Sequence, residues 1–272
     1  MTYTSEVLAD SPAGYWRFED GNPPFQDETA GNHDGTVKGV CQGWLSVREP
    51  GIANSRGLRW KTNSDEVGPY VEMSAGVLSS PTSWTYELWF RPTIIPASTG
   101  TEILLGIGGG EKSRIGWFSF QGNAWIIAYD TNGVVSATSR SSILISAANG
   151  AAPWPGNINN KWWHVVAVFT TPATSIATDL YINGVLDNFQ VANQGTSGHG
   201  IPTAGETTGL NYRGGGNAYG GYMDEVAVYP TALSAGRILA HYNAAVADDV
   251  FAGNGHRTPK HHARSRVLTP GG

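Results

Sequence analysis

The chain has 272 residues, of which 40% are hydrophobic and 14% are charged, against about 25% charged in an average soluble domain. Its 36 glycines are about twice the average share, and such a glycine-rich, charge-poor chain is typical of short strands joined by tight turns. No apolar run approaches the roughly 20 residues of a membrane-spanning helix, so we expect no membrane insertion.

The N-terminal 16 residues lack the basic and apolar regions of a secretory signal peptide. If this start is native, we expect a protein that stays in the cytosol, leaves by another route or is built into a particle released by lysis. Cys41 is the only cysteine, which excludes an internal disulfide and a thiolate metal cluster.

The first part of the chain predicts one helical turn within residues 4–12 and a strand over 14–19. A loop dense in Gly, Pro, Asn and Asp follows over 20–36, and short strands are expected at 57–61 and 70–74.

Residues 84–92 have the clearest strand pattern of the chain. Their side chains alternate, so that Trp84, Tyr86, Leu88 and Phe90 face one way and Thr85, Glu87, Trp89 and Arg91 face the other. We expect the first face to be buried and the second to be at least partly exposed to solvent.

Further strands are expected at 102–108, 115–120 and 124–130, the last followed by the hairpin signal Thr-Asn-Gly. Residues 136–160 are rich in Ser, Ala, Gly and Pro and predict a loop. Residues 161–169 are apolar on both faces, which favours a central strand.

Asn183-Gly184 predicts a type I′ hairpin, and a glycine-rich loop is expected over 193–220 before a strand at 221–229. The convincing helix is 232–246, with Ser234 as its N-cap. Leu239, Tyr242 and Val246 lie near one face of that helix.

Many short strands with one terminal helix predict an all-β fold, a two-sheet antiparallel β-sandwich formed by residues 1–249. Residues 250–272 form a basic C-terminal arm without hydrophobic periodicity, which we do not expect to pack alone.

The order of six motifs resembles the laminin-G-like, concanavalin-A-like jelly-roll family over about residues 5–246. The motifs are residues 7–20, 30–37, 84–92, 162–169, 180–185 and 221–238. The resemblance implies a jelly roll that commonly binds glycans or proteins and often holds a structural calcium ion. The N-terminal motif is most similar to copies in actinobacterial proteins and in minor tail proteins of phages that infect those bacteria.

Asp224 and Glu225 invite a catalytic interpretation, because glycosidases need two carboxylates about 5–9.5 Å apart across the scissile bond. Adjacent strand residues point to opposite faces, so these two are not expected to line one cleft. The Glu-x-Asp-x-x-Glu strand shared by similar glucanases and the Gly-x-Ser-x-Gly motif are both missing. We therefore expect no enzyme activity, with a hydrolase of unrecognised site as the weakest alternative.

Calcium is the better candidate for this region, because it takes six to eight oxygen ligands from loops. In similar jelly rolls the acidic end of the first strand lies near the Asp-Glu of the last, which implies a calcium site formed by Glu19 or Asp20, by Asn32 or Asp34, and by Asp224. The alternative is that the Asp and Asn residues shape turns and that Asp224 caps loop amides.

His164, in the 161–169 strand, is expected to be a hydrogen-bonded sheet histidine, since no second histidine lies at zinc spacing. Among the ten tryptophans, Trp16, Trp60, Trp84 and Trp162 lie in strand patterns and predict core positions. The candidates for stacking on a sugar lie near loops or strand ends: Trp44, Trp117, Trp125, Trp154 and Tyr212.

The arm carries four basic residues and no acid after Asp249. Without those four, 13 basic residues face 22 acidic ones, so the body has a net charge of −9. Four charges are too few to indicate nucleic-acid binding. We expect the arm to be held by a partner subunit, an identical copy included, through Arg257, Lys260, Arg264 and Arg266.

Together these patterns predict a non-catalytic virion structural protein, a phage minor tail or surface-decoration subunit, whose jelly roll binds host-surface glycan or protein. It would be assembled in the host cytoplasm. The alternative is an extracellular, lectin-like domain of a larger secreted bacterial protein.

Overall fold

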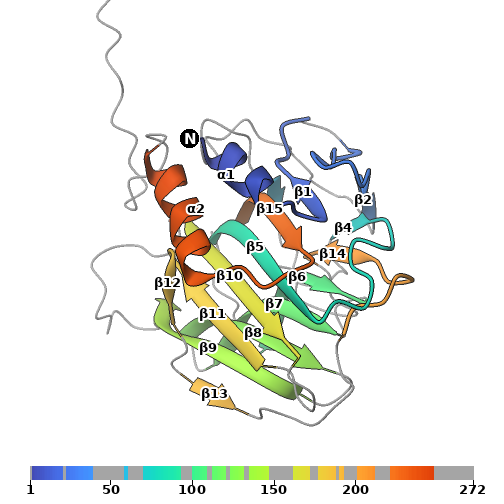
Figure 1. Cartoon of the computed structure of the whole chain (residues 1–272). Helices are drawn as coiled ribbons and strands as arrows, with labels where there is room; N and C mark the ends of the chain where they lie inside the picture. Colours follow the sequence, from blue (N-terminus) through green and yellow to red (C-terminus); the bar gives the residue numbers. More distant parts are fainter. Residues whose placement is uncertain are drawn as a thin grey trace, which may run out of the picture.

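The computed structural model describes residues 2–20, 23–38, 58–60, 70–92, 100–108, 112–120, 123–131, 135–146, 162–171, 177–187, 190–192, 201–211 and 221–247. Two antiparallel sheets pack face to face, and two helices from opposite ends of the chain lie side by side on one of them (Figure 1). The predicted β-sandwich is confirmed. The C-terminal arm lies outside the described residues.

The seven-stranded sheet carries the helices. Its order is β1 (Gly14–Trp16), β15 (Gly221–Tyr229), β5 (Ser83–Pro92), β10 (Trp163–Thr170), β11 (Ala177–Ile182) and β12 (Val185–Leu186), with β3 (Leu58–Trp60) also paired to β15. The helices are α1 (Tyr3–Ala9) and α2 (Ala235–Ala247). The predicted central strand, β10, lies between β5 and β11.

The eight-stranded sheet forms the second layer. Its order is β13 (Gln190–Ala192), β9 (Val135–Ser146), β8 (Asn123–Thr131), β7 (Ser113–Phe120), β6 (Gly100–Ile107), β14 (Thr208–Leu210), β4 (Tyr70–Met73) and β2 (Gly35–Lys38). Two predictions are wrong here, because β9 and β14 lie where loops were expected. Their neighbours β8, β6 and β4 supply ladder hydrogen bonds, so pairing overrides a weak side-chain pattern.

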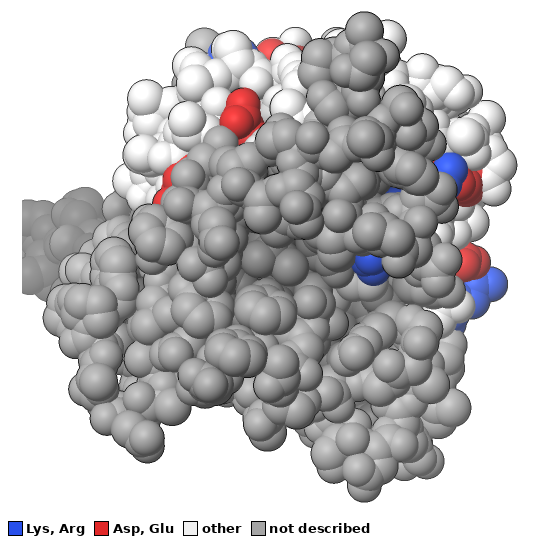
Figure 2. Space-filling model, turned by 90° about the horizontal axis from the view of Figure 1, so that it is seen from below, with Lys and Arg blue, Asp and Glu red and all other residues white. Residues whose placement is uncertain are grey.

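Two lysines on the described surface pair with glutamates. Lys38 lies 3.7 Å from Glu72 across β2 and β4, and Lys112 pairs with Glu206. In the view from below, described Lys and Arg side chains lie beside Asp and Glu at the right-hand rim (Figure 2). Exposed pairs of this kind contribute about 0–1 kcal/mol each, so packing dominates the stability of the fold.

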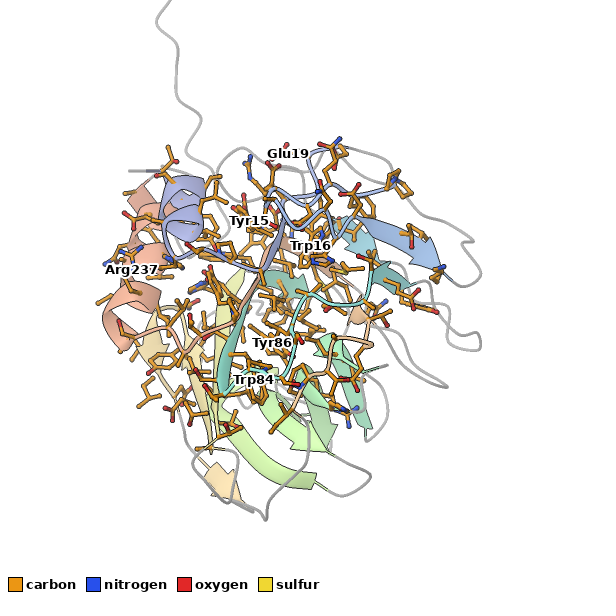
Figure 3. All side chains as sticks on the ribbon, turned by 45° about the vertical axis from the view of Figure 1, so that its right-hand side comes forward. Tyr15, Trp16, Glu19, Trp84, Tyr86 and Arg237 are labelled. Carbon is orange, nitrogen blue, oxygen red and sulfur yellow. The ribbon has the colours of Figure 1, made fainter. Side chains whose placement is uncertain are left out.

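The core lies between the inner faces of the two sheets and is rich in aromatic rings. Trp84 stacks on Phe169 with ring centroids 5.1 Å apart, and Tyr86 lies beside them (Figure 3). The indole N–H of Trp84 donates to Ser113 at 3.1 Å, and the Tyr86 hydroxyl lies 2.7 Å from the same oxygen. The polar atoms of these large side chains are therefore satisfied inside the core.

The alternation predicted for β5 is confirmed, but its second face is more deeply buried than expected, with Arg91 half-buried near the end of the strand. Trp84, Tyr86, Leu88 and Phe90 belong to the inner core, as expected. Thr85, Glu87 and Trp89 on the other face are fully buried, because α1 and α2 cover that face with a second apolar cluster.

The core positions predicted for Trp16, Trp84 and Trp162 are confirmed, whereas the side chain of Trp60 lies outside the described part. Ser234 caps α2 as predicted, since its side chain accepts from the Arg237 N–H at 3.3 Å.

The terminal segments differ from prediction in two respects. The expected single turn near the N-terminus is a helix of seven residues, capped by Thr2. In α2 the face with Leu239 and Val246 is partly exposed, and the buried stripe contains Ile238, His241 and Ala245. A histidine can occupy that stripe because carboxylates lie directly beneath it.

Candidate functional site

Glu87, in the middle of β5 on the helix-covered face, is the centre of a buried polar cluster. The hydroxyls of Tyr3 and Tyr229 donate to its two carboxylate oxygens at 2.8 and 2.7 Å. His164 Nε2 lies 2.8 Å from Oε1, and His241 Nδ1 lies 3.0 Å from Oε2. Side chains from α1, β10, β15 and α2 therefore converge on one carboxylate that is fully removed from solvent.

His241 bridges this carboxylate to a second one. Its Nε2 lies 2.8 Å from Asp10 Oδ2, while its Nδ1 contacts Glu87. Neither ionised carboxylate has a hydrogen to donate, so both imidazole nitrogens donate and the ring carries a positive charge. Burial alone would lower the pKa of His241, but the charges of Glu87 and Asp10 and the hydrogen bonds to them raise it to about 9.

The same contacts determine the ionisation of Glu87. Burial favours the protonated acid, but the positive charge of His241 and the hydrogen bonds from His164 and His241 outweigh it, and the pKa of Glu87 lies well below its ordinary value. The prediction that His164 is a hydrogen-bonded sheet histidine is confirmed.

Arg237 closes the outer end of the cluster. Its Nε donates to both oxygens of Asp10, at 2.9 and 3.1 Å, and one terminal nitrogen donates to the Glu6 carboxylate at 2.8 Å. Arg237 lies where α1 and α2 meet (Figure 3). The chain of charges therefore runs from the partly exposed guanidinium through Asp10 and His241 to the buried Glu87.

The opposite-face prediction for Asp224 and Glu225 is wrong, because β15 contains a β-bulge. Asp224 pairs with Trp89 and Ala227 with Glu87, so β15 has one residue more than β5 over this interval. Glu225 takes up the extra length with a φ of 50°, in the left-handed region. Strand alternation is interrupted there, and both carboxylates lie on the helix-covered face.

Glu225 is held by the first strand. Its carboxylate accepts hydrogen bonds from the Tyr15 hydroxyl and, at 3.4 Å, from Arg17 Nε. Burial raises the pKa of Glu225, the charge of Arg17 and these hydrogen bonds offset part of the rise, and the resulting value is about 7. Tyr15 lies beneath the N-terminal segment, with Glu19 farther out on the loop that follows (Figure 3).

The loop predicted to supply calcium ligands is organised by Asp27. Its carboxylate accepts from the backbone N–H groups of Tyr15, Thr29 and His33, each at 3.0 Å. One side chain thereby fixes the exit of β1 and the turn after it, as aspartate does in tight turns.

The predicted ligands have described contacts of their own. Asp20 accepts from the Gln26 N–H at 2.8 Å and Asp34 from the Asp27 N–H at 3.0 Å, while the Asn32 amide donates to the Ala30 carbonyl. These contacts match the alternative in which the residues shape the loop.

The two remaining ligand candidates differ in exposure. Glu19 lies 3.5 Å from Arg17 on the loop, and the fully buried Asp224 accepts from the Glu225 N–H at 2.9 Å. Within the described ranges no group of three His, Cys, Asp or Glu side chains is arranged to hold a metal ion. Calcium binding stays a prediction.

The predicted sugar-stacking residues fall at the edge of what the structure describes. Trp117 lies in β7 opposite Ile126, and Trp125 lies in β8 opposite Phe118, so the two are on neighbouring strands of the eight-stranded sheet. Their side chains lie outside the described part, as do all atoms of Trp44, Trp154 and Tyr212. The four basic residues of the arm also lie outside it.

Sequence reasoning did not single out Glu87, His241 or Asp10. The available signal is an acidic residue at the centre of an aromatic strand, together with a histidine in the terminal helix. A charge in such a place must be paired, but the pattern does not name its partners.

Chemically, the described cluster is a closed structural network. A glycosidase carboxylate must reach the glycosidic oxygen, the anomeric carbon or a water molecule. Glu87 and Glu225 are fully buried and their oxygens accept hydrogen bonds from neighbouring side chains. The helix-covered face therefore stabilises the fold. No described helix is long and apolar enough to cross a membrane.

Solved structures confirm the architecture. Domain 4 of an extracellular arabinanase from Geobacillus stearothermophilus, in complex with arabinotriose, is 15% identical, with a TM-score of 0.57 over 85% of this chain and 98% of that one. The binding domain of botulinum neurotoxin DC, in complex with rat synaptotagmin II, is 13% identical, with a TM-score of 0.56 over 87% of this chain.

A structure of botulinum neurotoxin type C, whose cell entry depends on interaction with two ganglioside molecules, is 12% identical, with a TM-score of 0.57 over 89% of this chain. The chain spans about half the length of these toxin structures, 52% and 53%. At such identities the likeness establishes the fold.

The sequence itself defines the family. No curated protein matches the chain in sequence. The family model described as the concanavalin A-like lectin/glucanases superfamily matches residues 65–239, more than half of the chain. With the two-sheet sandwich described above, this match shows that the chain belongs to the concanavalin A-like lectin/glucanases superfamily.

Proposed function

We propose that this protein is a non-catalytic jelly-roll module that binds a glycan. The observation that carries the proposal is that the described helices cover one sheet of the sandwich and leave the other sheet uncovered by any described helix. Both described helices cover the seven-stranded sheet, and its buried carboxylates are engaged in internal contacts there. The outer face of the eight-stranded sheet carries no described helix (Figure 1).

The proposed binding face is the outer face of the eight-stranded sheet, with Trp125 as the first residue to test. Aromatic rings pack against the apolar faces of sugars, and a tryptophan keeps an N–H group for a hydrogen bond. Trp125 is in register with Phe118, three positions from the inner-core residue Ile115, so strand alternation places it on the outer face. Trp117, two positions from Ile115, falls on the inner face and is not part of the proposed surface.

The comparisons favour a glycan over other ligands. The arabinanase domain was solved with arabinotriose, and the type C toxin depends on gangliosides for cell entry. The toxin domain solved with synaptotagmin makes a protein ligand the second candidate.

A glycan array with the full chain, run in calcium and in chelator, tests the proposal. We expect retention of at least one glycan class and loss of that signal in Trp125→Ala. Incubation with the retained glycan should release no new reducing ends. Release of reducing ends would show a hydrolase, and failure to bind any glycan would refute a lectin-like role.

The finer assignment, a minor tail or surface-decoration subunit of a phage, rests on the resemblance of the N-terminal motif to such proteins. The lectin-like domain of a secreted protein is its alternative. Mass measurement of the full chain and of a chain ending at residue 249 separates them. A closed oligomer that requires the arm supports the virion role, and a monomer in both cases supports the alternative.

A further inference from the structure

We propose that α1, Asp10 and α2 form one clasp, which opens from the sheet as a single unit and is held shut by the positive charge on His241. The two helices come from opposite ends of the chain and lie side by side (Figure 1). This inference is independent of the proposed glycan binding.

Neither helix is stable by itself. The helices have 7 and 13 residues, and isolated helices shorter than about 12–15 residues are marginal in water. Each helix also has few buried apolar side chains to hold it on the sheet. The buried side chains of α1 are Tyr3, Glu6 and Val7, and those of α2 are Ile238, His241, Ala244 and Ala245. Polar contacts therefore carry a large share of the attachment.

Those polar contacts link the two helices before they reach the sheet. Arg237 of α2 binds Asp10 and Glu6 from the N-terminal segment, and Asp10 binds His241 of α2. His241 then contacts Glu87 of β5, which also accepts from Tyr3 of α1. Detaching either helix breaks bonds made by the other, so the two should separate from the sheet together.

His241 must be positively charged for both of its ring nitrogens to donate a hydrogen bond. A neutral imidazole has one donor, so either Asp10 or Glu87 would lose its hydrogen bond and a buried carboxylate would lose its countercharge. The titratable and charged groups that face His241, directly or through one partner, are Tyr3, Glu6, Asp10, Glu87, His164, Tyr229 and Arg237.

The sign of the pH dependence follows from these neighbours. The pKa of His241 is raised from 6.5 to about 9, so its contribution is fully present below pH 6.5 and is lost as the pH rises through 9. The pKa of Glu87 is depressed, so its contribution persists above 4.5 and is lost only as the pH falls well below that value. The clasp should therefore stay shut in mild acid and open in alkali.

Hydrogen exchange of the full chain, read by rapid mixing and mass spectrometry and corrected for intrinsic exchange, tests this. Between pH 6 and 9, protection in α1 and α2 should fall together by about a hundredfold, while the centre of β10 keeps its protection. In His241→Gln, helix protection should already be low at pH 6 and should lose the hundredfold fall between pH 6 and 9.

Controls make the result specific. His33→Gln, on the β1–β2 loop, should leave helix protection unchanged. Arg237→Gln should lower protection in both helices, although the residue lies on α2 alone. Separate loss in the two helices, an equal loss in β10, or helix protection that does not change between pH 6 and 9 would overturn the proposal.

Discussion

Replacing Glu87 by glutamine keeps the size of the side chain but removes its charge and one of its two acceptor oxygens. The substitution disturbs hydrogen bonds from Tyr3, Tyr229 and His164 and takes away one of the two carboxylates that stabilise charged His241. The rise of the His241 pKa from 6.5 to about 9 corresponds to about 3 kcal/mol of interaction with its carboxylates.

Breaking a buried pair by removing one partner costs about 3–5 kcal/mol. We therefore expect Glu87→Gln to lower the free energy of unfolding by about 3 kcal/mol at pH 7. Urea denaturation followed by tryptophan fluorescence measures the loss.

The matched control is Glu72→Gln, which removes a surface carboxylate on the other sheet, 3.7 Å from Lys38. Its loss should stay below about 1 kcal/mol. If Glu87→Gln costs no more than Glu72→Gln, the four donors do not depend on the charge of Glu87, and the reasoning about the buried cluster is refuted.

Four further substitutions test local parts of the fold and site. Gly14→Ala should lower the free energy of unfolding by about 1–3 kcal/mol, because the added Cβ would lie 2.4 Å from the Trp16 indole. Its control, Gly205→Ala, has no atom within 4 Å of the added Cβ and should be nearly neutral in the same thermal melt. Gly236→Ala in the first turn of α2 should raise the free energy of unfolding by about 0.5 kcal/mol, since the nearest atom lies 3.9 Å from the added Cβ; a destabilised variant would refute the open geometry. Asp224→Ala should lower the melting temperature more in calcium than in chelator, and equal losses would leave Asp224 with a structural role alone.

Much of the fold could be predicted because strand alternation and turn chemistry act locally. The β5 pattern identified its core face, and Asn183-Gly184 forms the expected hairpin with positive φ at both residues, 52° and 79°. The wrong predictions concern features that depend on contacts between segments far apart in the sequence. The second face of β5 is buried because helices from both chain ends meet there, which no local pattern encodes.

The candidate site was less predictable for the same reason. Opposite faces for Asp224 and Glu225 follow from regular alternation, and the bulge that interrupts it is visible only through pairing with β5. Glu87 and His241 are 154 residues apart, so their contact cannot be inferred without knowing how the strands and helices are arranged.

Titration calorimetry with an oligosaccharide retained on the array decides whether this jelly roll binds a glycan without cleaving it. We predict saturable binding by the full chain, loss of the binding heat in Trp125→Ala, and recovery of the oligosaccharide at its original length. Shortened oligosaccharide after the titration, or no saturable heat with any retained glycan, would contradict the proposed function.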